Sequence, residues 1–543
     1  MAGAGTTVVA GSLPSDIDSF WFAVKDGAAI RPFDFVSVKS MGTKIIGIVD
    51  DLKVIPGPPA AKGGRGGGGG KTAIAEKEYA YSEEGTVVAK AAILASSPQP
   101  SMPVMPGRKV RMADSDEVAL ALGIPEMANP IPAGVIEMAG RGGKGGKYVP
   151  VSLDISYIAG PDTAHVNVSG ISGNRKTSYL LFLLQSAYQK LAGDVSIVIF
   201  NTKEQELLQL DVKDEPARED ARMFELMGLA AEPFSNVTYF LPRGSDGKAN
   251  SALVPRNSRA YSFELGDVYD RLDLLFSNTA DPWYDGIAAM TSYIAESWPL
   301  EGVSTWSDLA RFSRYPDDGA AAHGRPTMTT TTTTAAAATA HFNAYLQRFR
   351  RSTLFVDRRK TSVYLGSEVR RIRPGDVYVI DIAMLPTLEE QSLVVGDVMR
   401  AIDEAHAAAA AKRNDGGKGR PKYTIIFIDE INRFLPRPVP GRMMPATSEQ
   451  IMRTVMAGKS RGTVLFSAQQ FKSAVDGALH DNTGTHVFAK LGSTELAGPA
   501  YDMIDASVKR NIVRLNKGEV VLAHPAFRHP IKITFPRASF KKP

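Results

Sequence analysis

Residues 170–177 (GISGNRKT) combine glycines, a lysine and a hydroxyl in the order that a phosphate-binding loop requires. A short apolar stretch precedes them, and an amphipathic helix is predicted to begin at Lys176. Backbone N–H groups at a helix start attract an anion, the ammonium of Lys176 adds positive charge, and the Thr177 hydroxyl can reach Mg²⁺. The segment therefore predicts a site for ATP and Mg²⁺. The residues expected to bind the nucleotide are Gly170, Ser172, Gly173, Asn174, Arg175, Lys176, Thr177 and Ser178.

One position departs from the usual pattern, GxxxxGKS or GxxxxGKT. Arg175 stands where the last glycine belongs. That glycine lets the backbone approach the phosphates, so a side chain there strains the loop or partly fills it. An ordinary turn between a strand and a helix therefore remains an alternative to nucleotide binding.

Two adjacent carboxylates follow a second apolar run, residues 423–428, and they complete the predicted site. A buried strand would project these acids from its carboxyl end, toward the phosphates. Asp429 is then expected to hold Mg²⁺, and Glu430 to orient and deprotonate the attacking water. An apolar strand whose acids cap a helix has the same sequence, but a phosphate loop upstream, in the right order, favours the hydrolytic interpretation.

Two further residues are candidates for catalysis. Gln469 ends the apolar run 463–468, where an amide could bond both the water and the γ-phosphate; a polar strand end facing solvent is the alternative. Arg461 lies just before that run. It could complement a helix dipole, or it could reach into a neighbouring subunit's site as an arginine finger.

The elements that position these residues alternate between apolar runs and helical patterns, which predicts an α/β fold with a mainly parallel sheet. Residues 1–150 show many short strands with turn signals and are expected to form a small β-barrel. A parallel-sheet core is predicted for 151–213 and 366–543, the second part including the closing strands. Residues 214–365 carry helical patterns without a strong strand, so a helical insert is expected there. Loops or linkers are predicted at 57–71, 140–147, 327–340 and 412–418.

The composition excludes several classes of protein and of functional site. The chain has 543 residues, 44% hydrophobic and 22% charged, with a mean hydropathy of −0.11 and no apolar run of membrane-spanning length. It has no cysteine, which excludes disulfides, thiolate metal sites and cysteine nucleophiles and fits a cytoplasmic protein. The net charge of +5 permits a nucleic-acid partner without requiring one.

The order and spacing of these motifs resemble those of the HerA family of hexameric DNA-translocating ATPases, which are relatives of the FtsK motors. The similar segments are PFDFVSVK, KIIGIVDD and PGRKVRMADSDEVALALGI near the N-terminus, AHVNVSGISG and IVIFNTKEQELLQLD around the phosphate loop, and then VYVIDIAML, IIFIDEINRFLP, RGTVLFSAQQF and LNKGEVVLAHPAFRHPIKITF. The resemblance covers nearly the whole chain except the expected insert.

The resemblance implies a RecA-like P-loop core, a homohexameric ring with ATP bound between subunits, and double-stranded DNA driven through the channel. It assigns phosphate and magnesium contacts to Lys176 and Thr177, hydrolysis to Asp429 and Glu430, and sensing to Gln469. Arg461 is the nearest candidate for the arginine supplied by a neighbour. A partner nuclease, of the NurA type or a defence effector, is also implied, in DNA end processing or phage defence.

Two other functions remain open. Because Arg175 departs from the family pattern, the chain could be a ring scaffold that binds nucleotide and recruits an effector nuclease with little translocation. A protein-pumping secretion ATPase of the same superfamily is disfavoured by the predicted N-terminal barrel and by the lack of membrane segments.

Overall fold

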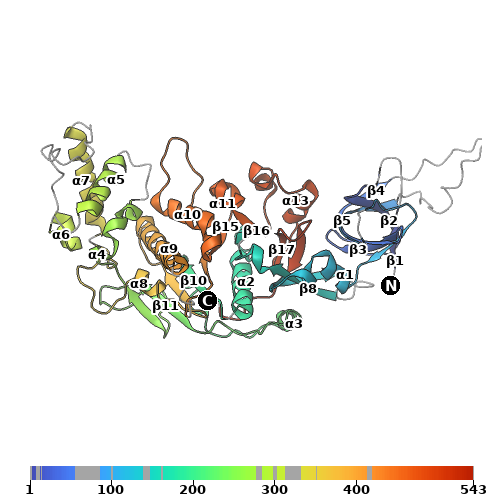
Figure 1. The fold of residues 1–543 in the computed structure, drawn as a ribbon, viewed down its shortest axis with the longest axis horizontal. Coiled ribbons are helices and arrows are strands. Elements are labelled where there is room, and N and C mark those ends of the chain that lie inside the picture. Colours follow the sequence, from blue (N-terminus) through green and yellow to red (C-terminus); the bar gives the residue numbers. More distant parts are fainter. Residues whose placement is uncertain are drawn as a thin grey trace, which may run out of the picture. The chain divides into compact units, whose positions relative to one another are not determined.

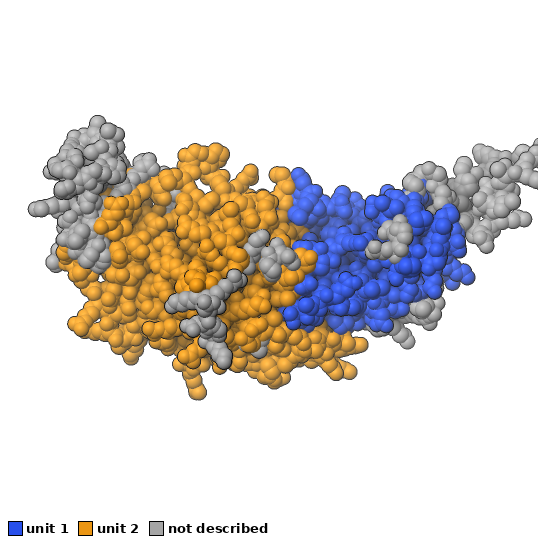
Figure 2. Space-filling model, in the orientation of Figure 1, with its two compact units in different colours: residues 1–154, 490–497, 501–535 blue, residues 155–489, 498–500, 536–543 orange. Residues whose placement is uncertain are grey.

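The computed structural model describes two compact units, which Figure 2 distinguishes by colour. Unit 1 comprises residues 1–154, 490–497 and 501–535, and unit 2 comprises residues 155–489, 498–500 and 536–543. The described residues are 3–7, 13, 15–55, 86–98, 102–138, 147–160, 163–191, 193–276, 284–297, 302–311, 332–349, 351–411 and 419–541. The predicted loops at 57–71 and 412–418 and nearly all of the predicted loop at 140–147 lie outside them.

Unit 1 contains the closed barrel expected from the sequence, with strand order β1-β2-β5-β4-β3-β6. The hairpin of β3 and β4 turns at Met41 and Gly42, whose φ angles of 51° and 82° suit the tight turns that join twisted antiparallel strands. Buried side chains such as Phe20, Phe22 and Val36 fill the barrel. The strands are β1 (Gly3–Thr7), β2 (Ser19–Val24), β3 (Phe35–Ser40), β4 (Thr43–Ile55), β5 (Thr86–Ser97) and β6 (Lys109–Met112).

The rest of unit 1 is built on antiparallel strands from both ends of the chain. β7 (Pro130–Met138) pairs with β8 (Lys147–Asp154) and with β18 (Ile531–Thr534), which also pairs with β17 (Glu519–Ala523). The closing strands β17 and β18 therefore belong to unit 1, whereas we expected them in the second part of the core. The helices of this unit are α1 (Ser115–Ala121), α12 (Ser493–Leu496) and α13 (Ala506–Val513).

Unit 2 is built on a parallel sheet with the order β12-β11-β13-β10-β14-β15-β9-β16. Its strands are β9 (Ala164–Ser169), β10 (Val195–Asn201), β11 (Val237–Pro242), β12 (Ser258–Tyr261), β13 (Val377–Asp381), β14 (Tyr423–Ile428), β15 (Thr463–Gln469) and β16 (Thr483–Phe488). The central strands are almost entirely buried, which explains their continuous apolar sequences. The predicted α/β fold class, a mainly parallel sheet with an N-terminal β-barrel, is confirmed.

Helices connect the strands of unit 2 (Figure 1). The helix after the phosphate loop is α2, and α9 and α10 pack against each other and contact β15. The helices are α2 (Lys176–Lys190), α3 (Arg218–Leu226), α4 (Leu265–Val268), α5 (Tyr284–Ser297), α6 (Trp306–Arg311), α7 (Thr332–Phe349), α8 (Leu365–Val369), α9 (Leu388–Ala411), α10 (Ala446–Arg461) and α11 (Gly477–Asp481), with 3-10 helices η4 (Tyr269–Leu275) and η6 (Ile431–Arg433).

The helical insert expected at residues 214–365 is only partly correct, because β11 and β12 lie in this range and belong to the parallel sheet. Their short runs of six and four residues give little periodic signal. Helices α5 and α6 do pack against α7, and Trp306 of α6 is buried and packs against Phe355. The expected linker 327–340 is also partly wrong: its described residues, 332–340, begin α7, since alanine favours helix.

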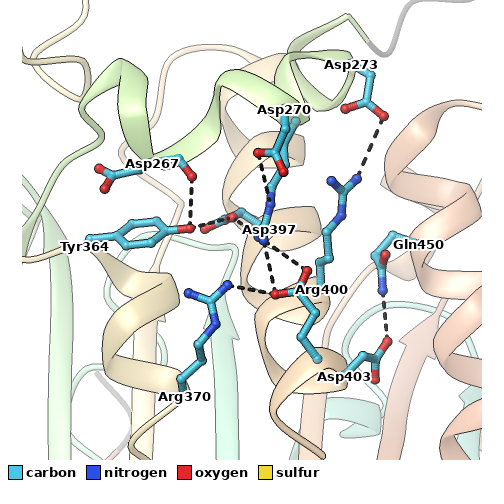
Figure 3. Close-up of polar contacts among 11 residues, drawn as sticks. Asp267, Asp270, Asp273, Tyr364, Arg370, Asp397, Arg400, Asp403 and Gln450 are labelled. Carbon is cyan, nitrogen blue, oxygen red and sulfur yellow. Dashed lines mark hydrogen bonds and ion pairs between the residues drawn. The ribbon is translucent and has the colours of Figure 1, made fainter. Parts of the chain in front are cut away.

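A network of charged side chains ties η4 and α8 to α9 (Figure 3). Arg271 binds Asp397 at 2.6 Å and Glu404 at 3.0 Å, and Arg370 binds Glu404 at 2.8 Å. The hydroxyl of Tyr364 donates to Asp397 at 3.0 Å. Burial raises the pKa of Asp397 to about 6, although Arg271 and Tyr364 oppose this shift. The network therefore provides the buried Asp397 carboxylate with a cation, Arg271, and a hydrogen-bond donor, Tyr364.

Candidate active site

The phosphate loop has the strand–turn–helix arrangement predicted from the sequence. Gly170, Ser172, Gly173 and Asn174 lie between the buried strand β9 and helix α2, and Thr177 and Ser178 lie in the first turn of that helix. The Gly170 N–H donates to the Gln469 carbonyl at 3.3 Å, which fixes the start of the loop to the end of β15. The N–H groups at the start of α2 are thus the anion-binding end of a helix of fifteen residues.

Arg175 precedes α2 in the left-handed backbone conformation, with φ 61° and ψ 29°. Glycine adopts this conformation freely, whereas for other residues it costs about 1–2 kcal/mol. Arg175 therefore has a strained backbone at the position where the usual pattern has glycine. Burial lowers the pKa of the Arg175 guanidinium, as does the nearby charge of Arg537, while Asp220 opposes the shift.

The two predicted halves of the site meet at Thr177 and Asp429. The Thr177 hydroxyl donates to the Asp429 carboxylate at 3.0 Å, although 252 positions separate them in the chain. A hydroxyl and a buried carboxylate side by side are hard oxygen ligands of the kind that Mg²⁺ takes together with substrate phosphates. The residues present therefore fit Mg²⁺.

Glu430 follows Asp429 directly and has a left-handed backbone, with φ 52°. Its N–H donates to Asp429 Oδ1 at 2.9 Å, and its own side chain is 12% exposed. The sharp turn at the end of β14 thus gives the two adjacent acids different positions. Asp429 stays buried beside Thr177, and the carboxylate of Glu430 remains partly accessible, as a base for water must be.

From the sequence we placed Lys203 at the end of a strand where ligands bind but gave it no role, and the structure shows that it contacts both acids. Its ammonium lies 3.1 Å from Asp429 Oδ2 and 3.2 Å from Glu430 Oε1. Burial alone would lower the pKa of Lys203, but the charges of and hydrogen bonds to the two acids outweigh it and raise the pKa. The available signal was the position of Lys203 just after strand β10, at the carboxyl edge where parallel sheets place ligands.

Lys176 is the second lysine of the site and is only 6% exposed. Burial lowers its pKa, and Lys203 acts in the same direction, while the charges of Glu430 and Asp429 oppose the shift. Lys176, Thr177, Asp429 and Glu430, which we predicted from two distant segments, are therefore brought together by the fold.

Gln469 is fully buried between β15 and β9. Its amide nitrogen donates to Asn167 at 2.6 Å and to Ser169 at 2.8 Å, and its amide oxygen accepts from Asn167 at 2.9 Å. Both ends of the amide thus have protein partners, and the link of this residue to the phosphate loop is its main-chain bond to Gly170. A sensing role for the amide stays a prediction.

Arg461 ends α10 and is exposed. It lies before the first residue of β15, whereas Gln469 is the last of the seven residues of that strand, a span of about 20 Å. Within this chain Arg461 is therefore at the opposite edge of the sheet from Thr177 and Asp429. Its charge acts instead on Asp403 of α9. The helix-dipole interpretation fits this position, and contact with a neighbouring subunit stays a prediction.

No family model and no curated protein matches the chain. Among solved structures it is similar to the bacterial conjugative coupling protein TrwB without its first 70 residues (14% identity, TM-score 0.46, covering 71% of this chain and 86% of that one). It is also similar to TrwB in complex with the ATP analogue ADPNP (13%, TM-score 0.47, 71% and 87%) and to VirB4 of Thermoanaerobacter pseudethanolicus (16%, TM-score 0.43, 75% and 96%).

Proposed function

We propose that this chain is an ATPase that drives double-stranded DNA through a hexameric ring. The observation that carries the hydrolytic part is the hydrogen bond from Thr177 to Asp429, with Glu430 and Lys203 at the same edge of the sheet. The ring, the duplex DNA and a nuclease partner in DNA end processing or phage defence rest on the sequence resemblance.

In this proposal each side chain has one task. Lys176 and the N–H groups at the start of α2 bind the phosphates, and Thr177 and Asp429 would hold Mg²⁺. The bound ion would neutralise charge that develops on the phosphates. Glu430 orients the attacking water and accepts its proton. Lys203 pairs with both acids and keeps the two carboxylates from repelling each other.

A second candidate is a ring scaffold that binds nucleotide and recruits an effector nuclease with little translocation. The strained backbone of Arg175 favours it, because that residue lies where the backbone must approach the phosphates. Both candidates bind ATP, and they differ in turnover and in its response to DNA.

The test is ATP hydrolysis by the full chain with and without duplex DNA, together with binding of a fluorescent ATP analogue. A motor shows turnover that duplex DNA stimulates and that Lys176→Ala or Glu430→Gln abolishes. The matched controls are Lys190→Ala, at the far end of α2, and Glu225→Gln, on the exposed face of α3, and both should keep the wild-type rate. Nucleotide binding without turnover would favour the scaffold, and loss of both in the wild type would refute an ATP site.

A further inference from the structure

The barrel of unit 1 carries a pocket that the ATPase proposal does not use. It has a volume of about 860 Å³ and is lined by parts of β1, β2, β3 and β6 and by the turn before β6. Five of its thirteen lining residues are basic, namely Lys25, Lys39, Arg108, Lys109 and Arg111, and none of the thirteen is acidic. A pocket with this lining attracts anions.

Three of these five cations have no acidic partner among the described residues. Arg111 is paired with Glu117, at 2.8 Å between Nη1 and Oε2. In the part of the chain that the structure describes, no carboxylate lies within ion-pair distance of Lys25, Lys39 or Lys109, and all three side chains are exposed. These three lysines can therefore bind an external anion without first breaking an internal ion pair.

The strand register spreads the lysines over the pocket. β2, β1, β6 and β3 are successive neighbours in the closed barrel. Lys109 pairs with Thr6 of β1, and Val110 pairs with Val38, the residue before Lys39. Lys25 directly follows β2. Because neighbouring strands lie about 4.8 Å apart, the charges extend over roughly 14 Å across the strands, more than one phosphate group fills.

The uncharged lining residues indicate which polyanion fits. They are small or β-branched, comprising Gly5, Thr6, Ala23, Val24, Ser37, Val38, Gly107 and Val110. A protein partner is usually anchored by aromatic or methionine side chains, and none lines this pocket. Nucleic-acid interfaces are instead polar and strongly basic. We propose that this pocket binds the phosphate backbone of a nucleic-acid strand, independently of ATP hydrolysis.

The lining also defines the mode of binding. Without aromatic side chains on which bases stack, contacts are made to phosphates, so the interaction is insensitive to base sequence and weakens steeply with salt. Each phosphate contact contributes about 0.7 to the slope of log K against log salt for a single strand, and about 0.9 for a duplex.

The experiment measures fluorescence anisotropy of labelled single-stranded and duplex oligonucleotides with the full chain between 50 and 200 mM salt. The Lys39→Glu/Lys109→Glu variant should bind at least one of the two forms about tenfold more weakly, with a salt slope smaller by about 1.4 for a single strand or 1.8 for a duplex. Lys517→Glu/Arg528→Glu, which makes the same charge change at exposed positions of unit 1, is the matched control.

Equal affinities and slopes for the pocket variant and the control would overturn the proposal, and so would binding of labelled polyglutamate as tightly as DNA. If the charge-reversal variant fails to fold, as judged by circular dichroism, Lys39→Gln/Lys109→Gln replaces it, with half the expected change in charge. ATP turnover without DNA should be the same in all barrel variants. A result that refutes nucleic-acid binding by the pocket can therefore be distinguished from one that refutes the ATP site.

Discussion

The role of Lys203 can be tested by the Lys203→Met substitution, which keeps much of the side-chain length and removes the charge. It deletes two contacts, of 3.1 Å and 3.2 Å, to carboxylates that are 2% and 12% exposed. A hydrogen bond to a charged group contributes about 1.5–3 kcal/mol. Because Lys203 itself is 46% exposed, solvent screens part of each contact. We expect the free energy of unfolding to fall by about 1–3 kcal/mol in metal-free buffer.

The assay is urea or thermal unfolding in EDTA, repeated with Mg²⁺. Because Mg²⁺ would bring positive charge to Asp429, the difference between the variant and the wild type should shrink when the ion is added. Lys213→Met is the control, since Lys213 is 42% exposed and also contacts a carboxylate, Glu232 at 2.9 Å, away from the site. If Lys203→Met is no more destabilising in EDTA than Lys213→Met, Lys203 does not neutralise the acid pair and our reasoning is refuted.

Three further substitutions test the strain and the buried charges. Arg175→Gly should be about 1 kcal/mol more stable than Arg175→Ala in urea unfolding, since both remove the side chain but only glycine relieves the left-handed backbone; equal stability would show an unstrained loop. Burial raises the pKa of Glu390 to about 7, so the folded state binds more protons than the unfolded state between about pH 4.5 and 7, and stability falls as pH rises through this window. Glu390→Gln should therefore raise stability at pH 8 by up to about 3 kcal/mol and leave it unchanged at pH 4, as melting curves at both values would show. Arg271→Met leaves Asp397 buried without its cation and should lower the free energy of unfolding by about 3–5 kcal/mol, of which adding Asp397→Asn should restore part.

The residues of the site that could be predicted are those with a local signal. The phosphate loop is a continuous segment of eight residues, and Asp429 and Glu430 directly follow a strand that is apolar because both of its faces are buried. Parallel strands bring their carboxyl ends to the same edge, so the meeting of Thr177 with Asp429 follows once both segments are assigned to one sheet. The barrel was predictable for the same reason, from short strands and turn residues.

The features that we missed depend on partners that are distant in the chain. A lysine after a strand is common, and only the position of the acids from β14 gives Lys203 a role. The sequence likewise does not reveal that Asn167 on the neighbouring strand bonds both ends of the Gln469 amide, and the sensing role of that amide stays a prediction. Strands β11 and β12 are recognisable through their pairing with the sheet, because four to six residues carry little periodicity of their own.

The two lysines of the site, Lys203 and Lys176, differ in how far the protein compensates the charge of each ammonium. We infer different tasks for them from this difference. The pKa of Lys203 is raised by Asp429 and Glu430 despite its burial, so this lysine already has its anions in the folded chain. The pKa of Lys176 is lowered by burial, which the same acids only partly offset. A buried ammonium that is incompletely compensated gains more from an incoming phosphate than one that is already paired. Lys176→Ala should therefore weaken binding of a fluorescent ATP analogue, whereas Lys203→Met should act mainly on the acids and on turnover. Equal losses of nucleotide affinity in the two variants would contradict this division.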